Sequence, residues 1–123
     1  MNTTATKQRR RNHRRGIRAE YLSLLYLILK TYRPLAIRYK TPIGEIDLIM
    51  KRGNTIAFIE VKHRRKRLDA AQAVHHHNQS RVLRASQYFI AAHPEFATHQ
   101  LRFDVCLVAW YRLPHHIPHA FTA

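Results

Sequence analysis

The sequence predicts a single α/β domain in which helices cover a small mixed sheet. A chain of 123 residues, 46% of them hydrophobic, is long and apolar enough to form one core. Helical and strand patterns alternate in the order helix, three strands, one or two helices and a strand. We expect this domain over residues 16–113, between a flexible basic tail (residues 1–15) and an irregular tail (residues 114–123).

The first expected element is a helix of about four turns over residues 16–30. The segment GIRAEYLSLLYLILK is rich in strong helix formers. Its second half is apolar almost all round, which predicts burial against a sheet. The apolar run is shorter than the ~20 residues that a membrane span requires. Glu20 is the only acidic residue of this helix.

Three strands are expected next. Pro34 ends the helix, and the alternating apolar residues of LAIRYK predict a short first strand. A second strand follows in GEIDLIM, and a third in TIAFIEVK, which is rich in β-branched residues. Between them, Gly53 and Asn54 have the chemistry of a tight hairpin turn. The second and third strands are therefore expected to pair side by side.

The remaining pattern predicts helices and one buried strand. LDAAQAV is expected to begin a short helix, and residues 78–93 a longer one that Pro94 ends. LRFDVCLVAW is typical of a buried strand. Its Cys106 is the only cysteine, which excludes an intrachain disulfide and favours a buried structural thiol.

The charge of the chain predicts a polyanionic partner. Its 22 Lys and Arg residues against 7 Asp and Glu residues give a formal net charge of +15. Nucleic acid is the first candidate and an anionic membrane surface the second. The basic tail is either a phosphate-binding arm or a solubility tail. With no secretory signal pattern, we expect a soluble cytoplasmic protein that does not bind membranes.

The expected hairpin concentrates the scarce acidic residues. Three of the seven lie within its two strands. A tight turn at Gly53–Asn54 places Asp47 directly opposite Glu60. The same register places Glu45 opposite Lys62. All four side chains would then share one face of the sheet.

Strand alternation places Ile46 and Leu48 together on the opposite face. Two carboxylates directly across a ladder repel each other. A hard divalent cation such as Mg²⁺ between Asp47 and Glu60 would remove that repulsion. Alternatively, the acids form a surface ion cluster in which Glu45 pairs with Lys62 and arginines neutralise the rest. The residues alone leave both interpretations open.

The motifs resemble a known family. Asp47, Glu60 and Lys62 match the PD-(D/E)xK signature of restriction-endonuclease-like nucleases. More closely, the chain resembles the YraN-like family of bacterial proteins, which are similar to archaeal Holliday-junction resolvases. The matching pieces are Gly16, Ala19 and Glu20, GEIDLI over 44–49, FIEVK over 58–62, Ala73 and Val74, Gln79, and RFDV over 102–105. The sequence departs from the family pattern at HHHN before Gln79 and at Ser23.

The resemblance implies a resolvase-like mixed sheet and a nuclease site. Asp47 and Glu60 would bind Mg²⁺ or Mn²⁺, and Lys62 would be catalytic. Glu20 and Gln79 would be accessory polar residues of that site. Glu45 and Asp104 match family positions without an assigned role. A homodimer is implied as well.

Basic residues near the expected site are candidate DNA contacts. The run HRRKR leaves the third strand directly, so we expect it to touch the DNA backbone. Two further arginines lie on the expected helix over residues 78–93. The complete set is Arg64, Arg65, Lys66, Arg67, Arg81 and Arg84. The histidine run at residues 75–77 favours a solvated or phosphate-facing cluster over a metal site, and His115, His116 and His119 are expected to have no role.

The sequence therefore predicts a Mg²⁺-dependent endonuclease acting on DNA phosphodiesters, with branched or junction DNA as its substrate. The alternative is a non-catalytic nucleic-acid-binding module that keeps the nuclease fold. A membrane-surface protein is a third interpretation. No nucleotide-binding glycine loop and no GxSxG nucleophile motif is present in the sequence.

Overall fold

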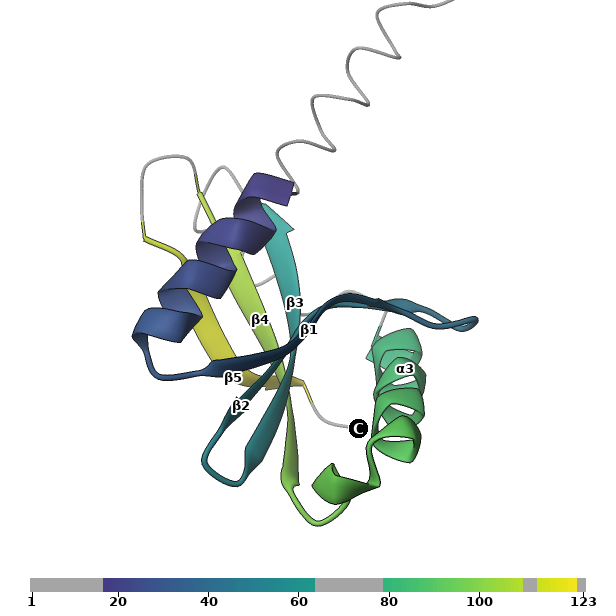
Figure 1. Ribbon diagram of the computed structural model, residues 1–123. Coiled ribbons are helices and arrows are strands. Elements are labelled where there is room, and N and C mark those ends of the chain that lie inside the picture. The colour runs from purple at the N-terminus through teal and green to yellow at the C-terminus, as the bar shows by residue number, and fades with distance from the viewer. Residues whose placement is uncertain (1–16, 64–78, 110–112, 122–123) are drawn as a thin grey trace, which may run out of the picture.

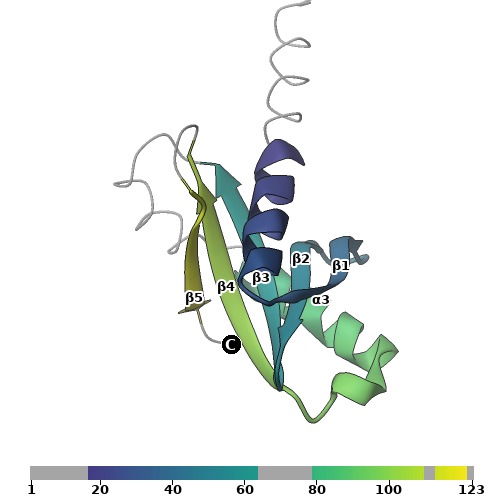
Figure 2. The same ribbon diagram turned by 60° about the vertical axis from the view of Figure 1, so that its left-hand side comes forward.

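The computed structural model describes residues 17–63, 79–109 and 113–121. These residues form a five-stranded mixed sheet with one helix on each face (Figures 1 and 2). The predicted fold class, an α/β mixed sheet flanked by helices, is confirmed. The predicted basic tail and the short helix expected at LDAAQAV lie outside the described residues.

The elements follow the predicted order up to the fourth strand. The N-terminal helix covers residues 17–29. It is followed by β1 (Arg33–Lys40), β2 (Glu45–Arg52), β3 (Thr55–His63), α3 (Gln79–Ala92), the 3-10 helix η1 (Pro94–Phe96), β4 (Gln100–Val108) and β5 (His115–Phe121). Among the described helices, none has the length and apolar composition needed to cross a membrane.

The strands lie in the order of the chain, β1-β2-β3-β4-β5. Only β3 and β4 are parallel, because the chain returns through α3 between them. The other neighbours are antiparallel. This topology makes β2 and β3 adjacent strands inside the sheet, so both strands of the acidic hairpin are held on both sides.

Each face of the sheet has its own hydrophobic core. On one face α3 packs Phe89 against Phe58, with the two rings 6.0 Å apart in a T-shaped contact. On the other face the N-terminal helix buries Leu27 completely against Leu48 and Cys106. The buried position predicted for Cys106 is confirmed. Both helices are thus anchored to the central strands.

The irregular tail predicted after residue 114 is wrong for residues 115–121, which form β5. The prediction relied on Pro118, which lacks a backbone N–H. An edge strand tolerates proline, since one side of its backbone pairs with no neighbour. The ladder between β4 and β5 is irregular at this level, and His119 has a φ of 54°.

Asp104 ties β5 to the rest of the fold. Its carboxylate is fully buried and is bound by Arg102, by His116 Nε2 at 2.7 Å and by the backbone N–H of His119 at 2.9 Å. Arg102 also donates to the hydroxyl of Tyr32, just after the N-terminal helix. Asp104 is therefore a structural residue, and His116 and His119 do have a role, contrary to the sequence-based prediction.

The Asp104→Asn variant is expected to lose about 3 kcal/mol of unfolding free energy, because it removes the buried charge that pairs with the partly buried Arg102. Burial alone would raise the pKa of Asp104, but the hydrogen bonds with His116, Arg102 and His119 hold it below its usual value. The stabilisation is therefore present at neutral pH and lost as the pH falls below about 4. Urea denaturation at pH 7 and pH 3 measures both effects.

The matched control is Glu95→Gln, the same acid-to-amide change at an exposed position of η1. It should change the unfolding free energy by less than about 0.5 kcal/mol. A comparable loss in both variants would contradict the structural role of Asp104.

Candidate functional site

The predicted register of the acidic hairpin is confirmed. Leu48 pairs with Ile59, and Arg52 with Thr55 on either side of the turn. Gly53 has a φ of 59°, a conformation that glycine adopts without strain. The ladder ends at Leu48 and Ile59, so the expected pairing of Asp47 with Glu60, one step further along this register, stays a prediction.

Asp47 is held by a backbone hydrogen bond across the hairpin. The N–H of Val61 donates to Asp47 Oδ2 at 2.8 Å. Among the described residues, no hydrogen bond reaches the second oxygen, Oδ1. Asp47 and Glu60 both line a pocket of about 220 Å³ between β2, β3 and the start of α3. The other residues lining it are Gly44, Glu45, Ile46, Ile59, Arg81 and Val82.

The strand β2 changes face at Asp47. Ile46 belongs to the core under α3, whereas Leu48 belongs to the core under the N-terminal helix. Strict alternation would put these two side chains on the same face. The prediction that they share a face is therefore wrong. Figure 1 shows the β1–β2 hairpin turning away from the rest of the sheet toward α3.

The neighbouring strand is irregular at the same level. Ile37 and Tyr39 keep the β1–β2 register, so the residue between them, Arg38, lies across from Asp47. Arg38 has a φ of 53°, which is uncommon for a residue with a side chain. Its guanidinium reaches the N-terminal helix and pairs with Glu20 at 2.5 Å. Glu20 is thereby held near enough to Asp47 for its charge to act on the aspartate.

The environment of Asp47 raises the pKa of its carboxyl group. Its pKa is raised to about 6 in total: burial is the largest cause, the hydrogen bond from Val61 opposes the rise, and the charges of Glu20, Glu60 and Glu45 add to it. Glu20 of the N-terminal helix, Glu45 of β2 and Glu60 of β3 therefore all repel the negative charge of Asp47. This arrangement is unfavourable unless a proton or a cation is present.

Lys62 pairs with Glu60 and not with Glu45. Its Nζ lies 2.7 Å from Glu60 Oε1, and both side chains are about one-fifth exposed. The alternative ion cluster, in which Glu45 would pair with Lys62, is not formed among the described residues. Lys62 stands next to one of the two expected metal ligands, within reach of anything bound there.

The residues present suit a hard cation only in part. Within the described ranges, no group of three or more His, Cys, Asp or Glu side chains is arranged to hold a metal ion. Mg²⁺ needs only one or two protein carboxylates, since water and phosphate oxygens complete its six ligands. The Oδ1 of Asp47, which receives no hydrogen bond from the described residues, and the carboxylate of Glu60, which also pairs with Lys62, would supply that minimum. The donor set therefore fits Mg²⁺ or Mn²⁺ shared with a phosphate.

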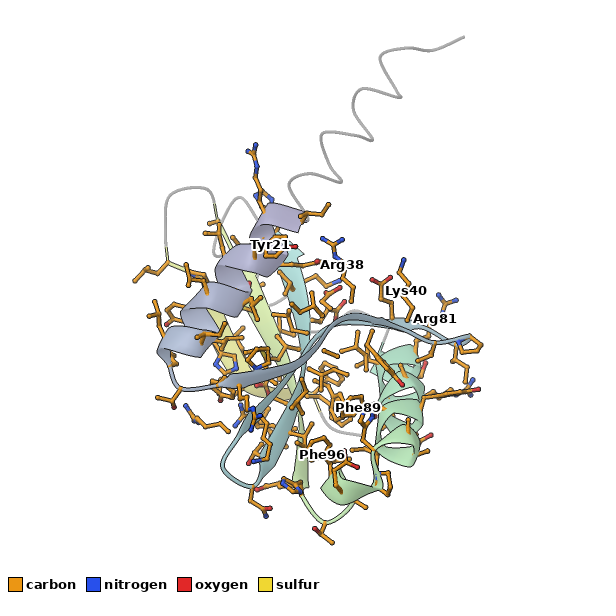
Figure 3. All side chains as sticks on the ribbon, in the orientation of Figure 1. Tyr21, Arg38, Lys40, Arg81, Phe89 and Phe96 are labelled. Atoms are coloured by element: carbon orange, nitrogen blue, oxygen red, sulfur yellow. The ribbon has the colours of Figure 1, made fainter. Side chains whose placement is uncertain are left out.

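Basic side chains stand beside these acids. In the view of Figure 3, Arg38, Lys40 and Arg81 follow one another along the β1–β2 hairpin toward the start of α3. A Cβ built on Gly44 would lie 3.2 Å from the Cβ of Arg81, so glycine at this position allows the hairpin to approach the helix closely. Arg81 lines the pocket without an ion pair to its acids among the described residues.

The remaining predicted contacts are less well defined. Arg84 is exposed on α3 and is not among the residues that line the pocket. Gln79 is the first residue of α3, and its side chain lies outside the described part. The run Arg64, Arg65, Lys66 and Arg67 lies outside the described residues, as does the histidine run over residues 75–77.

Comparison with known proteins places the whole site within one family. The model of the uncharacterised protein family UPF0102 matches residues 19–108. The chain belongs to UPF0102. This confirms the resemblance to the YraN-like family. The matched residues include Glu20, Asp47, Glu60 and Lys62, so the acidic cluster lies inside the family region.

Curated UPF0102 proteins are similar to this chain over nearly its full length. One from Rhodopseudomonas palustris (strain BisB18) is 51% identical over 110 residues, which cover 89% of this chain and 82% of the relative. One from Bradyrhizobium diazoefficiens is 49% identical over 119 residues, 97% of this chain and 90% of the relative. A protein from Methylorubrum extorquens is 50% identical over 114 residues, 93% and 89% of the two chains.

Sequence reasoning missed Arg38. Its role depends on a positive φ and on a contact between the N-terminal helix and β1, eighteen residues apart in the chain. Neither leaves a local pattern in the sequence, since LAIRYK is typical of an ordinary strand. A strand arginine close to an acidic hairpin was the only available signal, and in this UPF0102 chain arginines are common.

In EDTA, the Asp47→Asn variant is expected to be more stable than the wild type at pH 8. The pKa of Asp47 is raised in the folded protein, so its stabilising effect is complete below about pH 4 and is lost as the pH rises through about 6. The asparagine carbonyl can still accept the hydrogen bond from Val61. The gain should lie between about 0.5 kcal/mol, the value of a cross-strand pair, and about 3 kcal/mol, the value of two pKa units.

Urea denaturation of both proteins between pH 4 and pH 8 measures this difference, which should shrink toward pH 4. Glu95→Gln serves again as the control and should follow the wild type at every pH. If Asp47→Asn were less stable than the wild type at pH 8, Asp47 would be an ordinary ion-pair partner of the nearby arginines.

Proposed function

We propose that the protein is a Mg²⁺-dependent endonuclease that cleaves DNA phosphodiesters, with branched or junction DNA as its substrate. The observation that carries this proposal is the position of Asp47. Its partly buried carboxylate is close enough to Glu20, Glu45 and Glu60 for their charges to raise its pKa, and Lys62 stands beside Glu60. Such a group of acids is stabilised by a divalent cation, and a lysine next to it is suited to phosphate chemistry.

Nucleic acid as the substrate is supported by charge. The chain has a net charge of +15, while the acids of the hairpin form a local exception. Arg81 lies at the rim of the pocket, and Lys40 and Arg38 lie on the adjoining hairpin. These basic side chains would attract a phosphate backbone. Its oxygens would then lie near Asp47 and Glu60 and could complete the coordination of a cation bound there. The likeness to resolvases supports branched DNA as the form of the substrate.

Each residue then has a defined task. Asp47, oriented by the N–H of Val61, and Glu60, paired with Lys62, are the protein ligands for the cation. Mg²⁺ or Mn²⁺, when bound, supplies the Lewis acid for the phosphoryl group. Lys62 donates to a phosphate oxygen or orients the attacking water. Arg81 binds a non-bridging phosphate oxygen and so positions the backbone.

Lys62→Ala is expected to reduce cleavage of a synthetic four-way junction by about a hundredfold or more in Mg²⁺ or Mn²⁺, the usual range for a residue that moves or orients a proton. The thermal shift produced by the metal alone should persist, since Asp47 and Glu60 remain. Asp47→Asn should lose both the cleavage and the thermal shift. Gel assays on junction, flap and duplex DNA, together with melting curves, measure these outcomes.

Lys51→Ala, at the far end of β2, is the control and should cleave like the wild type. Full activity of Lys62→Ala would refute the role of the lysine. A wild type that binds junction DNA and never cleaves it, with either metal, would identify the protein as the non-catalytic nucleic-acid-binding module.

DNA binding is expected to weaken linearly with salt on logarithmic axes, because bound phosphates release their counterions. Arg81→Ala should lower the slope by about one unit, the value of one phosphate contact. Arg33→Ala, an exposed arginine at the other end of β1, should leave the slope unchanged. Fluorescence anisotropy in EDTA at several salt concentrations gives both slopes, and an unchanged slope for Arg81→Ala would remove this residue from the interface.

A further inference from the structure

The N-terminal helix has two apolar faces, of which only one is buried. Ala19 and Leu27 point into the core beneath the helix. The opposite face carries large hydrophobic side chains in solvent, here called the outer stripe. These are Tyr21, Leu22, Leu25, Ile28 and Leu29, with exposed fractions of 59, 51, 56, 42 and 76%. The prediction that this end of the helix is buried is therefore correct for one face only.

The described residues leave this stripe uncovered. Figures 1 and 2 show the helix lying along one face of the sheet, with its other side turned outward. Monomeric proteins rarely expose a contiguous apolar patch of this kind, and such patches usually mark an interaction site. The stripe lies on a helix that is itself firmly anchored, since Leu27 is completely buried.

The outer stripe is symmetric about its central residue. With about 100° between successive residues, Leu25 lies in the middle of the stripe both along the helix and around it. Tyr21 and Leu29 are each four residues from Leu25, and Leu22 and Ile28 are each three residues from it. A second, antiparallel copy would therefore meet the stripe with matching apolar side chains at every position.

The charge distribution also favours a second copy over a lipid surface. Residues 21–29 contain no charged side chain, although the chain carries a net charge of +15. Two copies repel each other least where their contact surfaces are uncharged. Helices that lie on membranes carry Lys and Arg along the flanks of their apolar face. Here Arg18 and Lys30 stand beyond the two ends of the stripe.

We propose that the outer stripe is the centre of a two-fold interface between two copies of this chain. The two helices pack antiparallel, with Leu25 on the symmetry axis against its own counterpart. Tyr21 then contacts Ile28 of the second copy, and Leu22 contacts Leu29. A specific interface buries about 800 Å² on each partner, so the stripe forms the apolar core and the surrounding polar surface forms the rim. This inference does not depend on the proposed cleavage activity.

The first test is the molar mass in solution, by size-exclusion chromatography with light scattering in salt high enough to displace nucleic acid. The wild type should have about twice the mass of the 14.6 kDa chain at tens of micromolar. Leu25→Glu places two like charges on the axis and should weaken the dimer at least about tenfold. Leu101→Glu, the same change at an exposed leucine of β4, should remain dimeric. Circular dichroism should show that both variants stay folded.

The second test examines the symmetry axis. Leu25→Cys should form a disulfide-linked dimer under mild oxidation at least about ten times faster than Leu22→Cys, because only a residue on the axis meets its own counterpart. The wild type is the control, since its Cys106 is buried. Equal rates for the two variants would refute the proposed register.

Three results would overturn the proposal. The first is a wild type that stays monomeric at about 100 µM. The second is a dimer that Leu25→Glu does not weaken. The third is a monomeric wild type that floats with phosphatidylglycerol vesicles when Leu25→Glu does not, which would assign the stripe to an anionic lipid surface.

Discussion

The pairing of β2 with β3 about Gly53 and Asn54 is the constraint on which the candidate site depends. This register brings Asp47 against the backbone of β3, where Val61 donates a hydrogen bond to it. A slip by one residue would turn the side chains of one strand to the opposite face. The same strands form the middle of the sheet and are covered on both faces, so the folding free energy of the two cores also maintains the positions of the acids.

The two aspartates of the fold show how environment separates a structural carboxylate from a candidate functional one. Asp104 is fully buried and receives hydrogen bonds from Arg102, His116 and His119, which together lower its pKa. Asp47 receives one hydrogen bond from the described residues, and its burial together with the nearby carboxylates raises its pKa to about 6. The carboxylate of Asp104 thus has all of these partners within the protein. The carboxylate of Asp47 is stabilised by a proton or by a cation, and a raised pKa of this kind is common at functional sites.

The N-terminal helix connects these features. Its inner face closes one core through Leu27, and its first turn brings Glu20 to Arg38 at the edge of the acidic hairpin. The irregular backbone of β1 at Arg38 and the change of face in β2 at Asp47 occur at the same level of the sheet. Here the β1–β2 hairpin leaves the plane of the sheet and approaches α3 at Gly44. The pocket lies where this turning hairpin meets the straight strand β3.

The sequence by itself determined the features that depend on local chemistry. Apolar periodicity predicted the N-terminal helix, the first four strands and α3. The turn residues Gly53 and Asn54 predicted the register in which Leu48 pairs with Ile59 and Arg52 with Thr55. Membership of UPF0102 was also readable, because the motifs GEIDLI and FIEVK are contiguous. These features are encoded by neighbouring residues, so no knowledge of distant contacts is needed to infer them.

Only the tertiary structure decided the features that depend on contacts between distant segments. The edge strand β5 forms despite Pro118 because Asp104 and β4 supply partners for it. Lys62 pairs with Glu60, and Arg38 pairs with Glu20 on the N-terminal helix. Ile46 and Leu48 lie on opposite faces, because β2 breaks its alternation at Asp47. The exposure of Leu25 likewise follows from which face of an apolar helix the sheet covers. Composition cannot specify that face, since packing geometry selects it.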